Sequence, residues 1–542
     1  MKKSNFIYRS LLMATLFLGS CKSDFLDVEP MTSVLESNFY KTTADAEMAL
    51  VGCYDGYQRT SSNGNLAFYV ASEVLSDNCF GGTGHTDGRA YQVLDRFDQG
   101  QSNSDNNLFN GTWTDYYAGI FRCNTLLNKL DGTNFGTNTA AKERIEGEAK
   151  FLRALMYFDL VRLFEKIPLI TEPTRDNVPQ ADPKETYKLI VEDLKFAIAN
   201  IPANAYPKAN AATNDGRVST YAAKALLARV YLFYTGYYGT DDLGVSKAEV
   251  LQGLEDVITS NEFDLVEDFS ALWPASSYIP NPANNTLDIS KYAGKGNIEV
   301  VFAQKFNNTQ NYDGNVDGNR WLVMMGMRNT NWSPYGKGWG GCTVSKRLVN
   351  EFNANDTRKA ASIIDIAGEG IQGFDIKDQR EYTGYSNKKY TPTALPDGTS
   401  NTGGSKDFQI SQDQDYVVIR YADVLLMAAE LGSAKAQEYF DDVRKRAYKT
   451  NFTALTATKE NILNERKFEF AFEGLRYWDL LRQGLNVAAA RLAQTENVTS
   501  GSVPDVVTIT QANVLKTRGF MQIPNTQITL SNGKLQQNNG WN

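Results

Sequence analysis

The sequence predicts a mostly helical protein, built as a helical-repeat scaffold with large irregular loop insertions. Apolar residues recur at helical spacing toward both ends of the chain, whereas residues 61–110 and 266–415 are rich in Gly, Asn, Asp and aromatic residues without that spacing. A length of 542 residues exceeds one ordinary compact core, and 42% hydrophobic with 22% charged residues is typical of a folded chain. We therefore expect stacked helices interrupted by two long loop regions.

Residues 1–20 have the features of a secretory signal peptide. Basic residues precede an apolar run over residues 11–18, which is too short to cross a bilayer. The run ends in Leu-Gly-Ser-Cys, which resembles the lipobox of bacterial lipoproteins. We expect cleavage before Cys21, lipidation of Cys21 and a lipidated tether over residues 21–37. An ordinary cleaved signal with a chance cysteine is the alternative.

Helical spacing dominates the N-terminal part of the body, residues 38–265. Pro168 ends one long stripe, and Asp182 followed by Pro183 is typical of a helix start. Residues 220–234 are apolar almost all round, so this helix must pack on several sides. Its small alanines beside Tyr and Leu are typical of tetratricopeptide helix pairs. We expect helices at residues 43–57, 113–130, 142–164, 183–198, 220–234 and 247–259.

The second irregular part, residues 266–415, precedes a C-terminal helical part and terminal segment, residues 416–542. Residues 300–303 are the clearest of its few strand-like runs. Long loops in compact proteins usually carry function, so we expect the ligand to bind in residues 266–415. Helical spacing returns at residues 420–431, 434–448 and 459–482.

Composition excludes several classes of function. Lys plus Arg number 55 and Asp plus Glu 63, and the resulting charge of −8 disfavours binding to nucleic acid. A single histidine excludes HExxH zinc hydrolases, and no CxxC spacing occurs. We expect no metal site, no cofactor and no enzyme. At most one disulfide is expected, with its pairing left open, among Cys53, Cys79, Cys123 and Cys342.

Charged residues are concentrated at residues 463–481, where Glu469 and Glu473 lie near Arg466 and Arg476 on the expected helix. Paired carboxylates could serve acid and base catalysis. Basic partners three and four residues away would keep them ionised, so we interpret these residues as a structural charge network.

Short motifs in a fixed order extend across nearly the whole chain. They include Arg-Tyr-Ala-Asp-Val-Leu-Leu at residues 420–426 and Phe-Glu-Gly at residues 472–474. With the lipobox, they resemble the SusD/RagB family of nutrient-uptake outer membrane lipoproteins of Bacteroidetes. Lys467 replaces an expected arginine and Asn539 an expected proline. Further motifs lie at residues 153–169, 216–232, 356–358, 443–447, 465–480 and 523–541.

The resemblance implies a SusD-like fold of four tetratricopeptide-like helix pairs with an irregular ligand-binding part. It also implies a lipid-anchored protein of the outer membrane that is exposed at the cell surface. Such a protein binds an oligosaccharide and delivers it to a SusC-like TonB-dependent transporter. A peptide-binding homologue of the same fold is one alternative, and a surface glycoside hydrolase is another.

Aromatic and polar residues cluster most densely at residues 320–341. Sugar rings stack their C–H faces on aromatic rings, and their hydroxyls bond to planar polar groups. Some of these rings could instead fill a local core, and a peptide could use the same rings. The candidate ligand-binding residues of this segment are Arg320, Trp321, Trp332, Tyr335 and Trp339.

A second candidate region precedes and follows His85, at residues 77–91. It combines polar and aromatic groups, although His85 itself is expected to be a solvated side chain in a polar loop. The glycines beside it do not form a phosphate-binding motif. The candidate ligand-binding residues here are Asp77, Asn78, Phe80 and Tyr91.

Overall fold

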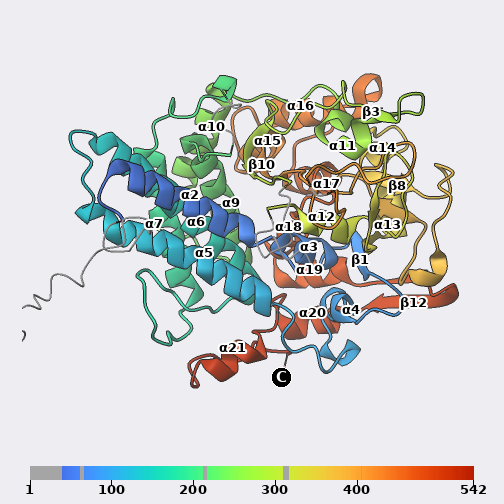
Figure 1. Ribbon diagram of the computed structural model, residues 1–542, viewed down its shortest axis with the longest axis horizontal. Helices are drawn as coiled ribbons and strands as arrows, with labels where there is room; N and C mark the ends of the chain where they lie inside the picture. The colour runs from blue at the N-terminus through green and yellow to red at the C-terminus, as the bar shows by residue number, and fades with distance from the viewer. Residues whose placement is uncertain (1–38, 62–65, 211–215, 309–316, 405, 542) are drawn as a thin grey trace, which may run out of the picture.

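The computed structural model describes residues 39–61, 66–210, 216–308, 317–404 and 406–541. Cys21 and the predicted signal peptide lie outside these residues. Stacked helices occupy the left and upper parts of the molecule, and short helices, strands and loops occupy the right (Figure 1). One large hydrophobic core extends through both parts, and a small second core contains Met327, Tyr335 and Ile364. The protein is therefore mostly helical, as the sequence predicts.

Four pairs of helices form the scaffold. Each pair also packs on the next, because α5 contacts α6, α7 contacts α9 and α10 contacts α15. The pairs are α2 (Thr43–Arg59) with α5 (Asn110–Lys129), α6 (Thr139–Phe164) with α7 (Pro183–Asn200), α9 (Thr220–Tyr238) with α10 (Lys247–Thr259), and α15 (Tyr421–Glu430) with α16 (Ala436–Tyr448).

Local sequence signals account for where these helices begin. Thr42 and Asp45 form a reciprocal capping box at α2. The Asp182 side chain accepts a hydrogen bond from Lys184 N at the start of α7, which confirms the predicted cap before Pro183. Helix α9 is buried on most sides against α7, α10 and α18 (Arg476–Leu481), so the prediction of an all-round apolar helix is also confirmed.

The strands of the described residues pair two by two and form no large sheet. All pairs are antiparallel except β5 with β6. The pairs are β1 (Cys79–Gly82) with β7 (Gly341–Val344), β2 (Ile279–Asn281) with β3 (Thr286–Asp288), β4 (Val300–Gln304) with β10 (Tyr416–Arg420), β5 (Met327–Arg328) with β6 (Lys337–Gly338), β8 (Ile363–Asp365) with β9 (Tyr385–Asn387), and β11 (Gln494–Ser500) with β12 (Val503–Ile509).

Short helices connect these strands and complete the chain. Most of them are only one or two turns long, so tertiary packing rather than helix propensity must stabilise them. They are α3 (Phe68–Val74), α4 (Ala90–Asp95), α11 (Pro274–Ser277), α12 (Arg320–Met325), α13 (Lys346–Glu351), α14 (Arg358–Ser362), α17 (Lys459–Glu469), α18 (Arg476–Leu481), α19 (Leu485–Leu492), α20 (Gln511–Thr517) and α21 (Asn525–Leu530).

Two predicted segments differ from the structure. Residues 61–110 were expected to be loop, but they contain α3, β1 and α4, with residues 66–82 buried. Residues 459–482 were expected to be one helix, but the chain leaves the helical conformation between α17 and α18. Phe472 and Gly474 there have φ of 64° and 72°, in the left-handed region that a helix cannot include. Tyr416 Oη would lie 3.0 Å from a Cβ on Gly474.

Buried ion pairs confirm the structural interpretation of the charged segment at residues 463–481. Glu469 accepts hydrogen bonds from Arg358 at 3.0 Å, from Arg420 at 2.5 Å and from Arg446. Burial alone would raise the pKa of Glu469, but the three arginines hold it well below its usual range. Glu473 is bound by Arg420 and Lys389 at 2.7 Å each. Both side chains are thus ion-paired to buried cations.

Two neighbouring buried carboxylates have opposite environments. Glu73 Oε1 accepts from Gly474 N at 2.6 Å, and Oε2 has no partner among the described residues. Burial raises the pKa of Glu73 to about 7. Asp77 accepts from Arg476 at 2.7 and 2.9 Å. Burial opposes ionisation of Asp77, but Arg476 and Lys467 hold its pKa well below the usual range.

We predict that Glu73→Gln stabilises the protein above pH 7. The folded-state pKa of Glu73 lies above its unfolded value, so the wild type loses stability as pH rises from about 4.5 to 7. Glutamine cannot ionise, so the free energy of unfolding at pH 8 should rise by about 2 to 3 kcal/mol. Denaturant unfolding at pH 5 and pH 8 measures both values. An equal effect at the two pH values would contradict the assignment.

Asp77→Asn is the matched comparison, and we expect it to lower the free energy of unfolding rather than raise it. The substitution leaves buried Arg476 without its carboxylate partner and leaves Lys467 with Glu351 alone, which should cost about 3 to 5 kcal/mol at neutral pH. A neutral or stabilising result would show that the ion pairs of Asp77 contribute nothing to folding.

Candidate functional site

A cleft of about 620 Å³ lies where α4 and α5 meet the segment between α12 and β7. Its lining comes from segments far apart in sequence, which only the fold brings together. This space is called the cleft from here on. Its lining residues include Thr83, Asp87, Tyr91, Thr112, Asp115, Met324, Arg328 and Trp339.

The first wall of the cleft is the loop between β1 and α4. Arg380 fixes this loop, because its guanidinium donates to the carbonyl oxygens of His85 at 2.8 Å, Asp87 at 2.7 Å and Gly88 at 2.9 Å. His85 is exposed, as the sequence predicts. The clamp holds Asp87 and Tyr91 on the same side of the cleft.

The second wall is formed by Trp339 and Arg328. Trp339 N donates to Val323 O at 2.8 Å, and its half-buried ring packs against the large core. The Arg320 guanidinium carbon lies 6.0 Å from the centre of this ring. Arg320 Nε is buried and has no hydrogen-bond partner among the described residues. Trp339 thus offers one aromatic face bordered by cationic groups.

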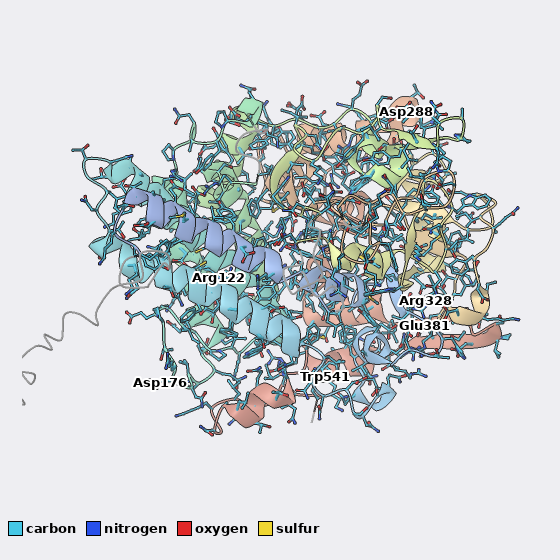
Figure 2. The ribbon with its side chains drawn as sticks, viewed as in Figure 1. Arg122, Asp176, Asp288, Arg328, Glu381 and Trp541 are labelled. Atoms are coloured by element: carbon cyan, nitrogen blue, oxygen red, sulfur yellow. The ribbon has the colours of Figure 1, made fainter. Side chains whose placement is uncertain are left out.

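Arg328 joins the two walls. Its guanidinium binds Asp87 at 3.1 Å and Asp378 at 3.0 Å, and it reaches Trp339 O at 3.4 Å. Hydrogen bonds from Arg328 lower the pKa of Asp378. Arg328 lies at the lower right of the molecule, well separated from Arg122 on the stacked helices (Figure 2). The walls of the cleft are therefore tied by ion pairs.

Helix α5 supplies the remaining side of the cleft with Thr112 and Asp115. Burial raises the pKa of Asp115 to about 6, and Arg59 opposes that shift. Its carboxyl group can therefore change charge in a mildly acidic range, while it faces a space that a polar ligand could occupy.

Two sequence-predicted residues, Tyr91 and Trp339, meet in the cleft although they come from the two separate candidate regions. Trp332 and Tyr335 lie elsewhere. They exchange two backbone hydrogen bonds of 2.8 Å with each other and pack in the small second core. Tyr335 Oη also donates to Glu369 at 2.6 Å.

Four other predicted residues lie inside the protein, where a ligand cannot reach them. Trp321 is 1% exposed, with its ring centre 4.9 Å from that of Tyr390. Asp77 is held by Arg476, Lys467 and Arg347, so its carboxylate has no free face toward solvent. Asn78, the next residue, is fully buried, and so is Phe80 in β1. The sequence shows that these residues are polar or aromatic, but not that long-range packing covers them.

Asp115, Arg328 and Met324 are lining residues that the sequence did not single out. Asp115 lies within a helical pattern, where a charged residue usually marks a solvent face. Arg328 follows an apolar run. Its place in the cleft is set by ion pairs with Asp87 and Asp378, which are both distant in sequence. Only the position of Arg328 within the aromatic segment at residues 320–341 could have suggested it.

Two other hollows in the described part of the chain contain none of the sequence-predicted ligand residues. One of about 640 Å³ is lined by Lys459, Arg476 and Arg491, and one of about 460 Å³ by Tyr54 and Phe302. Within the described ranges, no group of three or more His, Cys, Asp or Glu could hold a metal ion. No helix in the described part of the chain is long and apolar enough to cross a membrane.

Two family models match the chain. The SusD family model covers residues 372–541, and the model described as starch-binding associating with outer membrane covers residues 24–232. SusD-like protein P25 of Formosa agariphila is 26% identical over 518 residues, which is 90% of each chain. The two models cover most of the scaffold helices and the α4 and α5 side of the cleft, whereas Met324, Arg328 and Trp339 lie between the two matched ranges.

Solved structures have the same fold. Surface glycan-binding protein A from Bacteroides fluxus superimposes with a TM-score of 0.74 at 25% identity, over 92% of this chain and 99% of that protein. A laminarin-binding SusD-like protein gives a TM-score of 0.70 at 26% identity, over the same shares of the two chains. Sequence motifs, family models and fold agree, and the chain belongs to the SusD/RagB family.

Proposed function

We propose that the chain is a lipid-anchored protein of the cell surface that binds an oligosaccharide in the cleft and delivers it to a SusC-like TonB-dependent transporter. The observation that carries the proposal is the cleft itself. It combines the half-buried ring of Trp339 with the polar groups of Asp87, Asp115 and Arg328. A sugar needs both features, because it has an apolar C–H face and a polar edge.

Similar proteins support a glycan as the ligand. The solved relatives include proteins named as glycan-binding and laminarin-binding, at 25% and 26% identity. Laminarin oligosaccharides are therefore the first probe, followed by a glycan and peptide array on the soluble chain. Binding to peptides and to no glycan would replace the oligosaccharide with a peptide ligand.

The environment of the buried carboxylates supports a binding role over hydrolysis. Glu469 and Glu473 are both occupied by arginine or lysine partners, so neither is available to transfer a proton. Release of shorter sugars from the array ligands would favour the glycoside hydrolase alternative instead.

The lipobox at Cys21 and a family description that mentions the outer membrane support the proposed location. A tethered binding protein needs a route for its ligand into the cell, and a TonB-dependent barrel would supply it. Gentle solubilisation should recover the protein with a large outer membrane β-barrel. Recovery only as a free monomer, without crosslinks in cells, would contradict the partnership.

We predict that Trp339→Ala weakens binding of laminarin oligosaccharides without unfolding the protein. Loss of one stacking face should cost about 1 to 3 kcal/mol, by analogy with bases stacked on aromatic side chains. Titration calorimetry measures the affinity, and thermal unfolding reports stability. Trp321→Ala is the control, because loss of a core ring should cost about 3 to 5 kcal/mol of stability. Parent-like affinity in Trp339→Ala would exclude the ring as a binding face.

We predict that affinity falls as pH drops through about 6. Above this pH the Asp115 carboxylate is ionised and accepts charge-assisted hydrogen bonds from sugar hydroxyls, and below it these bonds weaken. The affinity at pH 5 should be roughly three- to tenfold lower than at pH 7.5. Titrations across this range should show that Asp115→Asn removes the dependence.

His85→Ala is the control for this pH series. His85 is the single histidine in the sequence, and it lies in the loop of the first wall, beside the cleft. The variant should keep the pH dependence. A dependence that disappears in His85→Ala and persists in Asp115→Asn would contradict the role of Asp115.

We predict that Cys21 is acylated. Cells fed an acyl analogue should label the wild type, whereas Cys21→Ala should remain unlabelled and leave the membrane fraction, since acyl chains supply the anchor. Equal labelling of both proteins would remove the proposed anchor.

A further inference from the structure

The four cysteines of the described residues form two pairs of buried thiols. Cys53 lies beside Cys123, and Cys79 lies beside Cys342, close enough for each neighbouring thiol to raise the pKa of its partner. The Cys79 thiol donates to Glu73 O at 3.1 Å. All four are free and fully buried. The members of each pair come from segments far apart in sequence, so the fold favours one of the three complete pairings that four cysteines allow.

The first pair lies where two scaffold helices cross closely. A Cβ on Gly56 of α2 would lie 2.9 Å from Gly119 Cα of α5. One turn away, Arg122 Nη1 donates to Gly52 O at 2.9 Å. The two contacts show that the helices run in opposite directions here, which places Cys53 beside Cys123. Without side chains at the two glycines, the backbones approach closely enough for short side chains to meet.

The second pair lies on the β1–β7 ladder. Cys79 is opposite Val344 and Gly82 is opposite Gly341, so Cys342 is opposite Gly81 and on the same side of the ribbon as Cys79. Cys342 has a φ of 56°, which turns its side chain out of the regular strand direction.

Tyr91 covers this part of the ladder. A Cβ on Gly81 would lie 2.7 Å from Tyr91 Cβ. The second thiol pair therefore lies directly beneath the wall of the cleft that Tyr91 forms.

We propose that both pairs are oxidised to disulfides as the chain folds, and that the Cys79–Cys342 bridge fixes the two walls of the cleft against each other. The inference rests on the proposed function, which places the chain in an oxidising extracytoplasmic compartment. In each bridge two thiols lose two protons and two electrons and form one S–S bond. The electrons and protons reduce the disulfide of a thiol–disulfide oxidant to two thiols.

Oxidation must accompany folding. A hydrogen bond from Cys123 and burial raise the pKa of the Cys53 thiol, and burial and Cys342 raise that of Cys79. The thiolate is the reactive form, so the packed thiols are both unreactive and inaccessible to an oxidant. The bridges can form only before α2 closes on α5 and before β1 closes on β7.

The second bridge has a consequence for binding. Strand β1 leads into the loop that carries Asp87 and then into α4, which carries Tyr91, and one residue separates Trp339 from β7. A covalent link between the strands restricts any separation of the two walls. A cleft ordered in advance loses less free energy to ordering when the ligand binds.

Peptide mapping tests the bridges directly. The full chain is exported by a host with its own leader, unfolded in the presence of iodoacetamide and digested without reduction. Mass spectrometry should find Cys53 linked to Cys123 and Cys79 linked to Cys342, with the same peptides alkylated after reduction. Four alkylated thiols without prior reduction, or crossed links such as Cys53 to Cys79, would overturn the proposal.

Paired substitutions test the link to the cleft. Cys79→Ala/Cys342→Ala should weaken binding of laminarin oligosaccharides several-fold and lower the melting temperature by about 5 °C. Cys53→Ala/Cys123→Ala should lower the melting temperature similarly and leave the affinity unchanged. Equal affinities for wild type and Cys79→Ala/Cys342→Ala would overturn the effect on the cleft.

If the substitutions disturb folding, a second preparation of the unsubstituted chain tests the same effect on binding. The same chain without its leader, folded in a reducing cytoplasm, should keep its thiols and bind more weakly than the exported protein. The mapping also separates the two proposals. Mapped bridges in a protein that binds no glycan would contradict the proposed ligand and support the bridges. Glycan binding by an exported protein whose four thiols are all reduced would support the ligand and contradict the bridges.

Discussion

Glu469 lies at the centre of a buried cluster of ion pairs that joins the helix pairs to the irregular part. Its carboxylate binds Arg358 of α14, Arg446 of α16 and Arg420, the residue before α15. Moving each of these ions out of water costs several kcal/mol, which mutual attraction offsets only while the geometry is kept. Removal of any partner would leave a buried charge unpaired. The fourth helix pair, α14 and α17 therefore have one allowed arrangement.

The same constraint reaches the cleft through the next helix. Arg476 begins α18 and holds Asp77 with two hydrogen bonds, and Asp77 comes two residues before β1. Because β1 pairs with β7, this contact sets the position of the Asp87 loop and of α4 relative to Trp339. Arg380 and Arg328 then fix the surface of the loop. The buried ion pairs thus determine the shape of the cleft, although most of the residues that form them do not line it.

Local signals predicted the scaffold helices, because their caps and apolar stripes lie within a few residues of one another. The cap of Asp182 before Pro183 and the all-round apolar helix α9 are examples. For residues 66–82 the local signals predicted the wrong structure. Their Asp, Asn and Ser residues are typical of a loop, yet partners such as Arg476, some 400 positions away, bury them. Only a three-dimensional contact could reveal that.

The two tryptophans Trp321 and Trp339 show where sequence reasoning about the site ends. They belong to the same short segment and offer the same chemistry. Trp321 points into a cluster with Tyr390 and Tyr416 that is itself assembled by β10, whereas Trp339 lies at the turn before β7 and keeps part of its ring exposed. Strand pairing decides which ring faces the cleft. A binding site built this way depends on the pairing of β1 with β7 more than on the number of aromatic residues, and substitutions that loosen that ladder should alter ligand binding even when every ring is intact.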